Sequence, residues 1–116
     1  MKISDLNPFT RRDNMQTLAK ELAALTARRD AIAAKQSTAA IALDRALADQ
    51  TRHMMEGNID DEALDIKRQA AVDRAESSLK GFEKPLAALA ANIAETQARL
   101  TKETQAVAAG KRTGVK

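Results

Sequence analysis

The chain has 116 residues, of which 44% are hydrophobic and only 2% aromatic, and it contains no cysteine. This length allows at most one domain, and the lack of cysteine excludes disulfides, thiolate catalysis and zinc sites built on sulfur. The net charge of +3 belongs to residues 110–116, because the remaining body carries sixteen basic and sixteen acidic residues. Equal numbers of interspersed positive and negative charges over residues 1–109 do not indicate a surface that binds a nucleic-acid duplex.

The composition is typical of long helices. Alanine, the strongest helix former, is abundant, whereas there are four glycines and two prolines. No apolar run approaches the roughly 18–20 residues of a membrane span, and the N-terminus lacks the apolar segment of a secretory signal. We therefore expect an all-α protein without a transmembrane segment. Cytoplasmic residence is the default expectation, with leaderless secretion or virion association left open.

Residues 1–9 are predicted to form a loose N-terminal lead-in. The first helix is expected from about residue 10 to residue 56, starting at either Asn7-Pro8 or Thr10. Its apolar residues follow a heptad pattern up to Ile32, and the next two steps, to Leu43 and to Met54, are eleven residues each. A step of eleven indicates either a stutter in a coiled coil or the drift of a straight amphipathic helix.

A turn is predicted at residues 57–60. Gly57 is expected to close the first helix in the left-handed conformation, and Asn58 or Asp60 to cap the next helix. Acidic residues crowd the first turns after this point, where they meet the positive end of the helix dipole. So short a connection predicts two antiparallel helices that fold about Asn58.

The second helix is expected over about residues 61–109, with Gly110 ending it and residues 110–116 forming a basic flexible tail. Large aliphatic residues recur every seven positions along this helix, which predicts a coiled-coil seam. The predicted packing seam of both helices comprises Leu18, Leu22, Leu25, Ile32, Leu43, Leu47, Val72, Leu79, Phe82, Leu86, Leu89, Ile93, Leu100 and Val107.

Pro85 interrupts this second helix. A proline inside a helix removes one hydrogen bond, and its ring meets the carbonyl four residues earlier, here that of Gly81. The heptad phase continues from Leu79 to Leu86 across this point. The sequence therefore favours one helix kinked near Gly81–Pro85 over two separate helices.

The expected fold is an antiparallel two-helix coiled-coil hairpin. Alanines widen the apolar stripe beside the seam, for example Ala87, Ala90 and Ala94. Two such hairpins would bury this stripe as a four-helix bundle, so a homodimer is the favoured oligomer. The alternative is that alanine simply fills exposed helix positions.

We find no candidate catalytic, metal-binding or cofactor-binding residue. His53, the single histidine, is expected at the surface near Asp49 rather than in a metal site. The acidic cluster after the turn lacks the alternating ligands and the glycine of a calcium loop. Lys111, Arg112 and Lys116 could contact an anion, but no aromatic stacking platform accompanies them, which disfavours nucleic acid as a partner.

These features favour a non-enzymatic structural or interaction protein that self-associates and offers a helical face to a partner. Short alanine-rich hairpins of this style look like scaffold, adaptor or assembly-chaperone subunits of bacterial and phage systems. The second hypothesis is a nucleic-acid or membrane-surface binder that uses the basic tail.

A third hypothesis rests on the turn, Met55-Glu56-Gly57, and on the length of the chain. In length, helix–turn–helix architecture and turn position, the chain resembles the secreted helical hairpins of the WXG100 type. Those proteins have Trp-x-Gly at the turn, where this chain has Met55 in place of the tryptophan. The resemblance implies a secreted, non-enzymatic hairpin.

Overall fold

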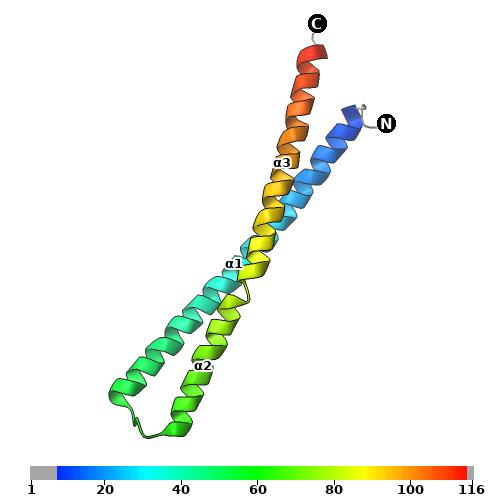
Figure 1. The fold of residues 1–116 in the computed structure, drawn as a ribbon. Coiled ribbons are helices and arrows are strands. Elements are labelled where there is room, and N and C mark those ends of the chain that lie inside the picture. Colours follow the sequence, from blue (N-terminus) through cyan, green and yellow to red (C-terminus); the bar gives the residue numbers. More distant parts are fainter. Residues whose placement is uncertain (1–7, 115–116) are drawn as a thin grey trace. The chain divides into compact units, whose positions relative to one another are not determined.

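The computed structural model describes the backbone of residues 8–114 and the side chains of residues 12–110. The order of elements is α1 (Pro8–Glu56), α2 (Glu62–Lys80) and α3 (Glu83–Gly114), and the described residues include no strand (Figure 1). The chain is therefore all-α and hairpin-like, as predicted. The predicted lead-in lies outside the described residues except for the start of α1. This helix begins at Pro8, the earlier of the two predicted starts, and not near residue 10.

The helices form two compact units. The terminal unit pairs α1 up to Arg29 with α3 from Ala88 onward, and the turn unit comprises Asp30–Ala87. In the turn unit, the second half of α1 and α2 lie side by side and are joined by the turn (Figure 1). The contact between Gln50 and Gln69 centres this hairpin close to Ile59, about one residue beyond the predicted Asn58.

The less exposed residues of α1 include a series that alternates in steps of three and four. The eleven-residue step from Ile32 to Leu43 is filled by half-buried Gln36 and Ala39, so the phase is unbroken. The stutter interpretation is therefore wrong, because small and polar residues occupy seam positions. The series comprises Met15, Leu18, Leu22, Leu25, Arg29, Ile32, Gln36, Ala39, Leu43, Ala46, Gln50 and His53.

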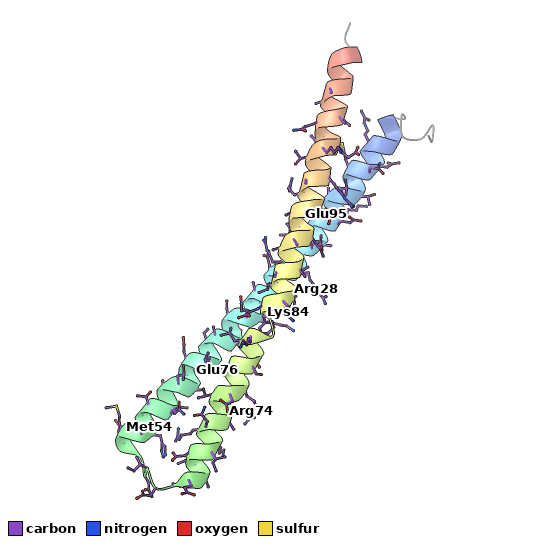
Figure 2. The ribbon with its side chains drawn as sticks, in the orientation of Figure 1. Arg28, Met54, Arg74, Glu76, Lys84 and Glu95 are labelled. Carbon is purple, nitrogen blue, oxygen red and sulfur yellow. The ribbon has the colours of Figure 1, made fainter. Side chains whose placement is uncertain are left out.

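Met54 does not continue this series. Its side chain is 64% exposed near the end of α1 (Figure 2), whereas the neighbouring His53 is 6% exposed. One residue corresponds to about 100° around a helix. The unbroken phase therefore turns His53 inward and Met54 outward.

Asp61 caps α2, in place of the predicted Asn58 or Asp60. Its carboxylate accepts a hydrogen bond from the Leu64 backbone N–H at 3.1 Å, which satisfies one of the free donors of the first turn. Asn58 instead accepts from the Asp60 backbone N–H at 3.0 Å and so stabilises the turn that precedes the helix.

The predicted second helix consists of two segments. The helical hydrogen-bond ladder is interrupted at Gly81-Phe82, within the stretch where a kink was predicted, and α3 begins at Glu83. Gly81 keeps helical dihedrals (φ −63°, ψ −18°). Pro85 lies in the first turn of α3, and it has no N–H to donate to the Gly81 carbonyl, which accounts for the position of the interruption.

The predicted helix end at Gly110 is wrong, because α3 continues to Gly114. A glycine inside a helix costs about 0.8–1.0 kcal/mol relative to alanine, which does not by itself end a helix. A glycine that does end one usually adopts a positive φ, and no residue in the described chain has a positive φ.

Candidate functional site

His53 is at the centre of a polar cluster at the turn end of the hairpin. Its Nε2 lies 3.0 Å from Oδ1 of Asp65, across the turn on α2. The predicted surface histidine beside Asp49 is therefore wrong: His53 is buried, and Asp49 forms an exposed ion pair with Arg52. Burying an imidazole is costly unless it is hydrogen-bonded, and Asp65 supplies that partner.

Gly57 makes room for the His53 ring. A Cβ built on Gly57 would overlap Nδ1 of His53 and would lie 2.9 Å from its Cε1 and 2.8 Å from its backbone oxygen. Gly57 does not take the predicted left-handed conformation. Its N–H instead donates to the His53 carbonyl at 2.8 Å. The lack of a side chain, rather than backbone freedom, accounts for glycine at this position.

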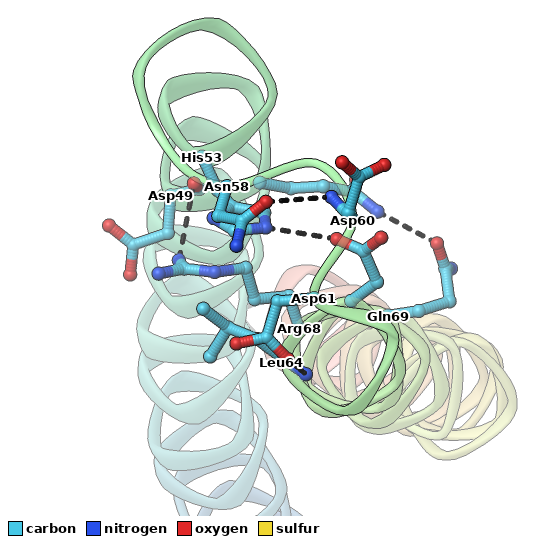
Figure 3. Close-up of polar contacts among 10 residues, drawn as sticks. Asp49, His53, Asn58, Asp60, Asp61, Leu64, Arg68 and Gln69 are labelled. Atoms are coloured by element: carbon cyan, nitrogen blue, oxygen red, sulfur yellow. Dashed lines mark hydrogen bonds and ion pairs between the residues drawn. The ribbon is translucent and has the colours of Figure 1, made fainter.

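Two further contacts join α1 and α2 beside His53. Nε2 of Gln50 donates to Oε1 of Gln69 at 2.7 Å, and Nη1 of Arg68 donates to the Asp49 carbonyl at 3.3 Å (Figure 3). Nε of Arg68 is buried without a hydrogen-bond partner among the residues that the structure describes. Together with the His53–Asp65 contact, these bonds hold α1 and α2 together at their turn end.

The predicted acidic cluster has divided roles. All four residues are exposed, but Asp61 also caps α2 and Asp65 also contacts His53. Glu62 and Asp65 lie in the first turn of α2, where they stabilise the positive end of the helix dipole. Within the described part of the chain, no three His, Cys, Asp or Glu side chains are grouped to hold a metal ion.

Four large apolar side chains near the turn are exposed. The exposed fractions are 64% for Met54, 80% for Met55, 66% for Ile59 and 70% for Ile66. Met54 and Ile66 also line an open hollow of about 290 Å³ between α1 and α2. The other residues that line it are Gln50, His53, Asp65, Arg68 and Gln69.

The sequence reasoning missed this apolar cluster. Met54 was placed in the eleven-residue series of core residues, and Ile59 and Ile66 were not assigned a role. The signal that could have found the cluster is the heptad phase of α1, which leads from Leu43 through Ala46 and Gln50 to His53.

The predicted seam residues are mostly half-buried. Val72 is buried at 3% exposure, Leu47 is exposed at 40%, and the other twelve are half-buried. In the terminal unit, Leu25 and Leu18 line two hollows whose other walls come from α3, so this unit is also an antiparallel helix pair. Thr96, at a seam position between Ile93 and Leu100, is buried at 8%.

The residues of the predicted basic tail are placed only in part. The backbone of Lys111 and Arg112 belongs to α3, while their side chains and the whole of Lys116 lie outside what the structure describes. In the described region, no helix combines the length and the hydropathy needed to cross a bilayer.

The chain matched no family, no curated protein and no solved structure in comparisons with known proteins.

Proposed function

We propose that this chain is a non-enzymatic structural protein, a helical hairpin that self-associates as a homodimer and serves as a scaffold, adaptor or assembly-chaperone subunit in the cytoplasm of a bacterial or phage system. Its working surface is the coiled-coil seam together with the alanine-rich flanks beside it. No cofactor is needed for such a role.

The observation that carries this proposal is the thin core. Among residues 12–110, Val72 is the one hydrophobic side chain that is buried, and the other thirteen seam residues are half-buried or exposed. Burial of apolar surface stabilises a fold by about 25 cal/mol per Å². A second copy that covers the half-exposed seam would add to this stabilisation without any change in the hairpin itself.

Alanines beside the seam support the same proposal. Ala87, Ala90 and Ala94 are exposed, and their spacing places them on one flank of α3 next to Leu86 and Ile93. Small side chains allow a neighbouring helix to approach closely. A flank of this kind suits the antiparallel or parallel packing of a four-helix bundle.

The test is the mass in solution, measured by light scattering behind size exclusion over a concentration series. We expect a dimer that persists on dilution. The double variant Ala90→Glu/Ala94→Glu places two charges on the alanine flank. It is expected to be monomeric because burying these unpaired charges in a dimer interface is costly. Glutamate forms helices well, so the hairpin itself should remain folded.

The matched control is Ala91→Glu/Ala98→Glu. These two alanines are also exposed, and they lie on the outer face of α3, away from the seam. This variant should remain dimeric. A wild-type chain that is monomeric at every concentration would overturn the proposal, as would equal dissociation of both double variants.

A further inference from the structure

Most of the exposed large hydrophobic residues in the described chain lie at the turn end of the hairpin. Of the six large hydrophobic residues that are exposed, four lie within residues 54–66, and the other two, Ile41 and Leu47, are on α1. We call Met54, Met55, Ile59 and Ile66, with the hollow between Met54 and Ile66, the turn-end surface. Contiguous exposed apolar patches mark interaction sites, and Met54 and Ile66 line one hollow together.

The turn-end surface has an excess of negative charge, although Arg68 also lines its hollow. Residues 54–66 contain Glu56, Asp60, Asp61, Glu62 and Asp65 and no lysine or arginine. All five acids are exposed, and Asp65 also contacts His53. Arg52, Lys67 and Arg68 flank these acids, so residues 52–68 carry five acidic and three basic residues and a net charge of −2.

This charge indicates which kind of partner the turn-end surface would bind. A second copy of the same surface would bring five exposed carboxylates against five others, and an anionic lipid or a nucleic acid would meet the same excess of negative charge. A cationic partner is attracted. Its apolar side chains would meet the two methionines, whose flexible thioethers adapt to differently shaped partners.

The surface is also held in place for binding. The His53–Asp65 contact at 3.0 Å and the Gln50–Gln69 hydrogen bond at 2.7 Å join the two helices that form the hollow. Met54 comes from α1 and Ile66 from α2, so the hollow keeps its shape as long as these bonds persist. A preformed site lowers the entropic cost of binding.

We propose that the turn-end surface is a docking site for a basic amphipathic helix of a partner protein, with apolar side chains at helical spacing placed on Met54 and Ile66 and with lysine or arginine facing the acidic residues. The four apolar residues of this site lie outside the seam, and the alanine flank is on α3, so docking here does not require self-association.

The experiment is a fluorescence-anisotropy titration of the full chain with a labelled lysine–leucine peptide whose leucines recur at helical spacing. A scrambled peptide of the same composition has the same charge and no apolar face. We expect the amphipathic peptide to bind at least about tenfold more tightly than the scrambled one. Binding should weaken with salt, since exposed charges are screened.

Variants locate the site. Met54→Gln/Ile66→Gln should weaken binding of the amphipathic peptide about tenfold or more, and Asp60→Asn/Glu62→Gln should weaken it and lessen its salt dependence. The matched controls are Ile41→Gln, an exposed isoleucine away from the turn, and Glu76→Gln/Glu83→Gln, two exposed acids away from the turn. Both controls should bind like the wild type.

Three outcomes would overturn the proposal: equal binding of the amphipathic and scrambled peptides, unchanged binding by the turn-end variants, or no binding of either peptide. Binding to vesicles rich in phosphatidylserine that is lost in Met54→Gln/Ile66→Gln would show that the surface meets a membrane instead. Light scattering on the same samples reports self-association independently, so failure of one proposal is distinguishable from failure of the other.

Discussion

Nε2 of His53 and Oδ1 of Asp65 lie 3.0 Å apart, although the two residues are separated by twelve positions in the chain. The histidine side chain is 4% exposed and the aspartate side chain 47% exposed, so the contact is sheltered on the histidine side and open on the other. It joins the last turn of α1 to the first turn of α2. The contact therefore ties the two helices together directly across the turn.

Removal of this contact should destabilise the hairpin. Asp65→Ala leaves a buried imidazole nitrogen without its partner, and we expect the free energy of unfolding to fall by about 1–3 kcal/mol. Urea denaturation at one fixed protein concentration measures it, because association would otherwise change the apparent stability. Asp73→Ala is the control, since Asp73 accepts an exposed hydrogen bond within α2, and its effect should stay below about 0.5 kcal/mol.

Asp65 also contributes charge to the first turn of α2. A double-mutant cycle with His53→Ala separates this effect, because the helix-dipole contribution is the same in both backgrounds. We expect a coupling energy of about 1 kcal/mol between the two residues. A coupling energy near zero would show that the contact does not stabilise the turn.

Gly57→Ala should also destabilise the hairpin, by about 1–3 kcal/mol, because the new Cβ would displace the His53 ring. Thermal or urea unfolding measures the change. Gly110→Ala is the matched control: a Cβ at Gly110 meets nothing within 4 Å, and the position is helical, so a gain of about 0.5–1 kcal/mol is expected.

The His53→Ala background tests the cause of the Gly57 effect. In this background Gly57→Ala should lower the free energy of unfolding by less than it does in the wild type. Some loss should remain, because a Cβ at position 57 would still lie 2.8 Å from the backbone oxygen of His53. A Gly57→Ala chain as stable as the wild type would contradict the role assigned to this glycine.

The junction between α2 and α3 is expected to close when Pro85 is replaced. Pro85→Ala restores an N–H that can donate to the Gly81 carbonyl, and the Leu86 N–H already donates to the Phe82 carbonyl at 3.1 Å. Amide hydrogen exchange of residues 81–86 should slow as the ladder becomes continuous. If exchange at the junction is unchanged, the proline is not the cause of the interruption.

The sequence predicts the helices well because its local signals agree. Helix α1 ends at Glu56, as the following Gly57 and Asn58 indicate, and the acidic residues mark the start of α2. The end of α3 was not predictable from Gly110 alone. A helical glycine costs only about 1 kcal/mol relative to alanine, so the helical tendency of the flanking residues can exceed it.

The site was harder to predict because apolar residues do not define the seam near the turn. An eleven-residue step from Leu43 predicts Met54 as the next core residue. The alternating steps of three and four along α1 lead instead to His53. The relation between Gly57 and the His53 ring, and the choice of Asp65 over Asp49 as partner, depend on where α2 lies beside α1. Such contacts follow from tertiary structure and have no local signature.

The unbroken phase of α1 leads to one more expectation, which compares Leu43→Ala with Met54→Ala. Leu43 is half-buried at a seam position, so its truncation should lower the free energy of unfolding by about 1–2 kcal/mol, less than the 2–5 kcal/mol of a fully buried leucine. Met54 is 64% exposed, and its truncation should change stability by less than about 0.5 kcal/mol.

Urea denaturation of both variants at the same protein concentration measures the two effects. A stutter would place Met54 in the seam and make the two truncations comparably costly, which would contradict the phase described above. A small effect for Met54→Ala together with a clear loss for Leu43→Ala would confirm that the end of α1 turns its methionines outward. It would also show that the turn-end surface can be altered without unfolding the hairpin, because the residues that hold the turn, His53 and Asp65, remain in place.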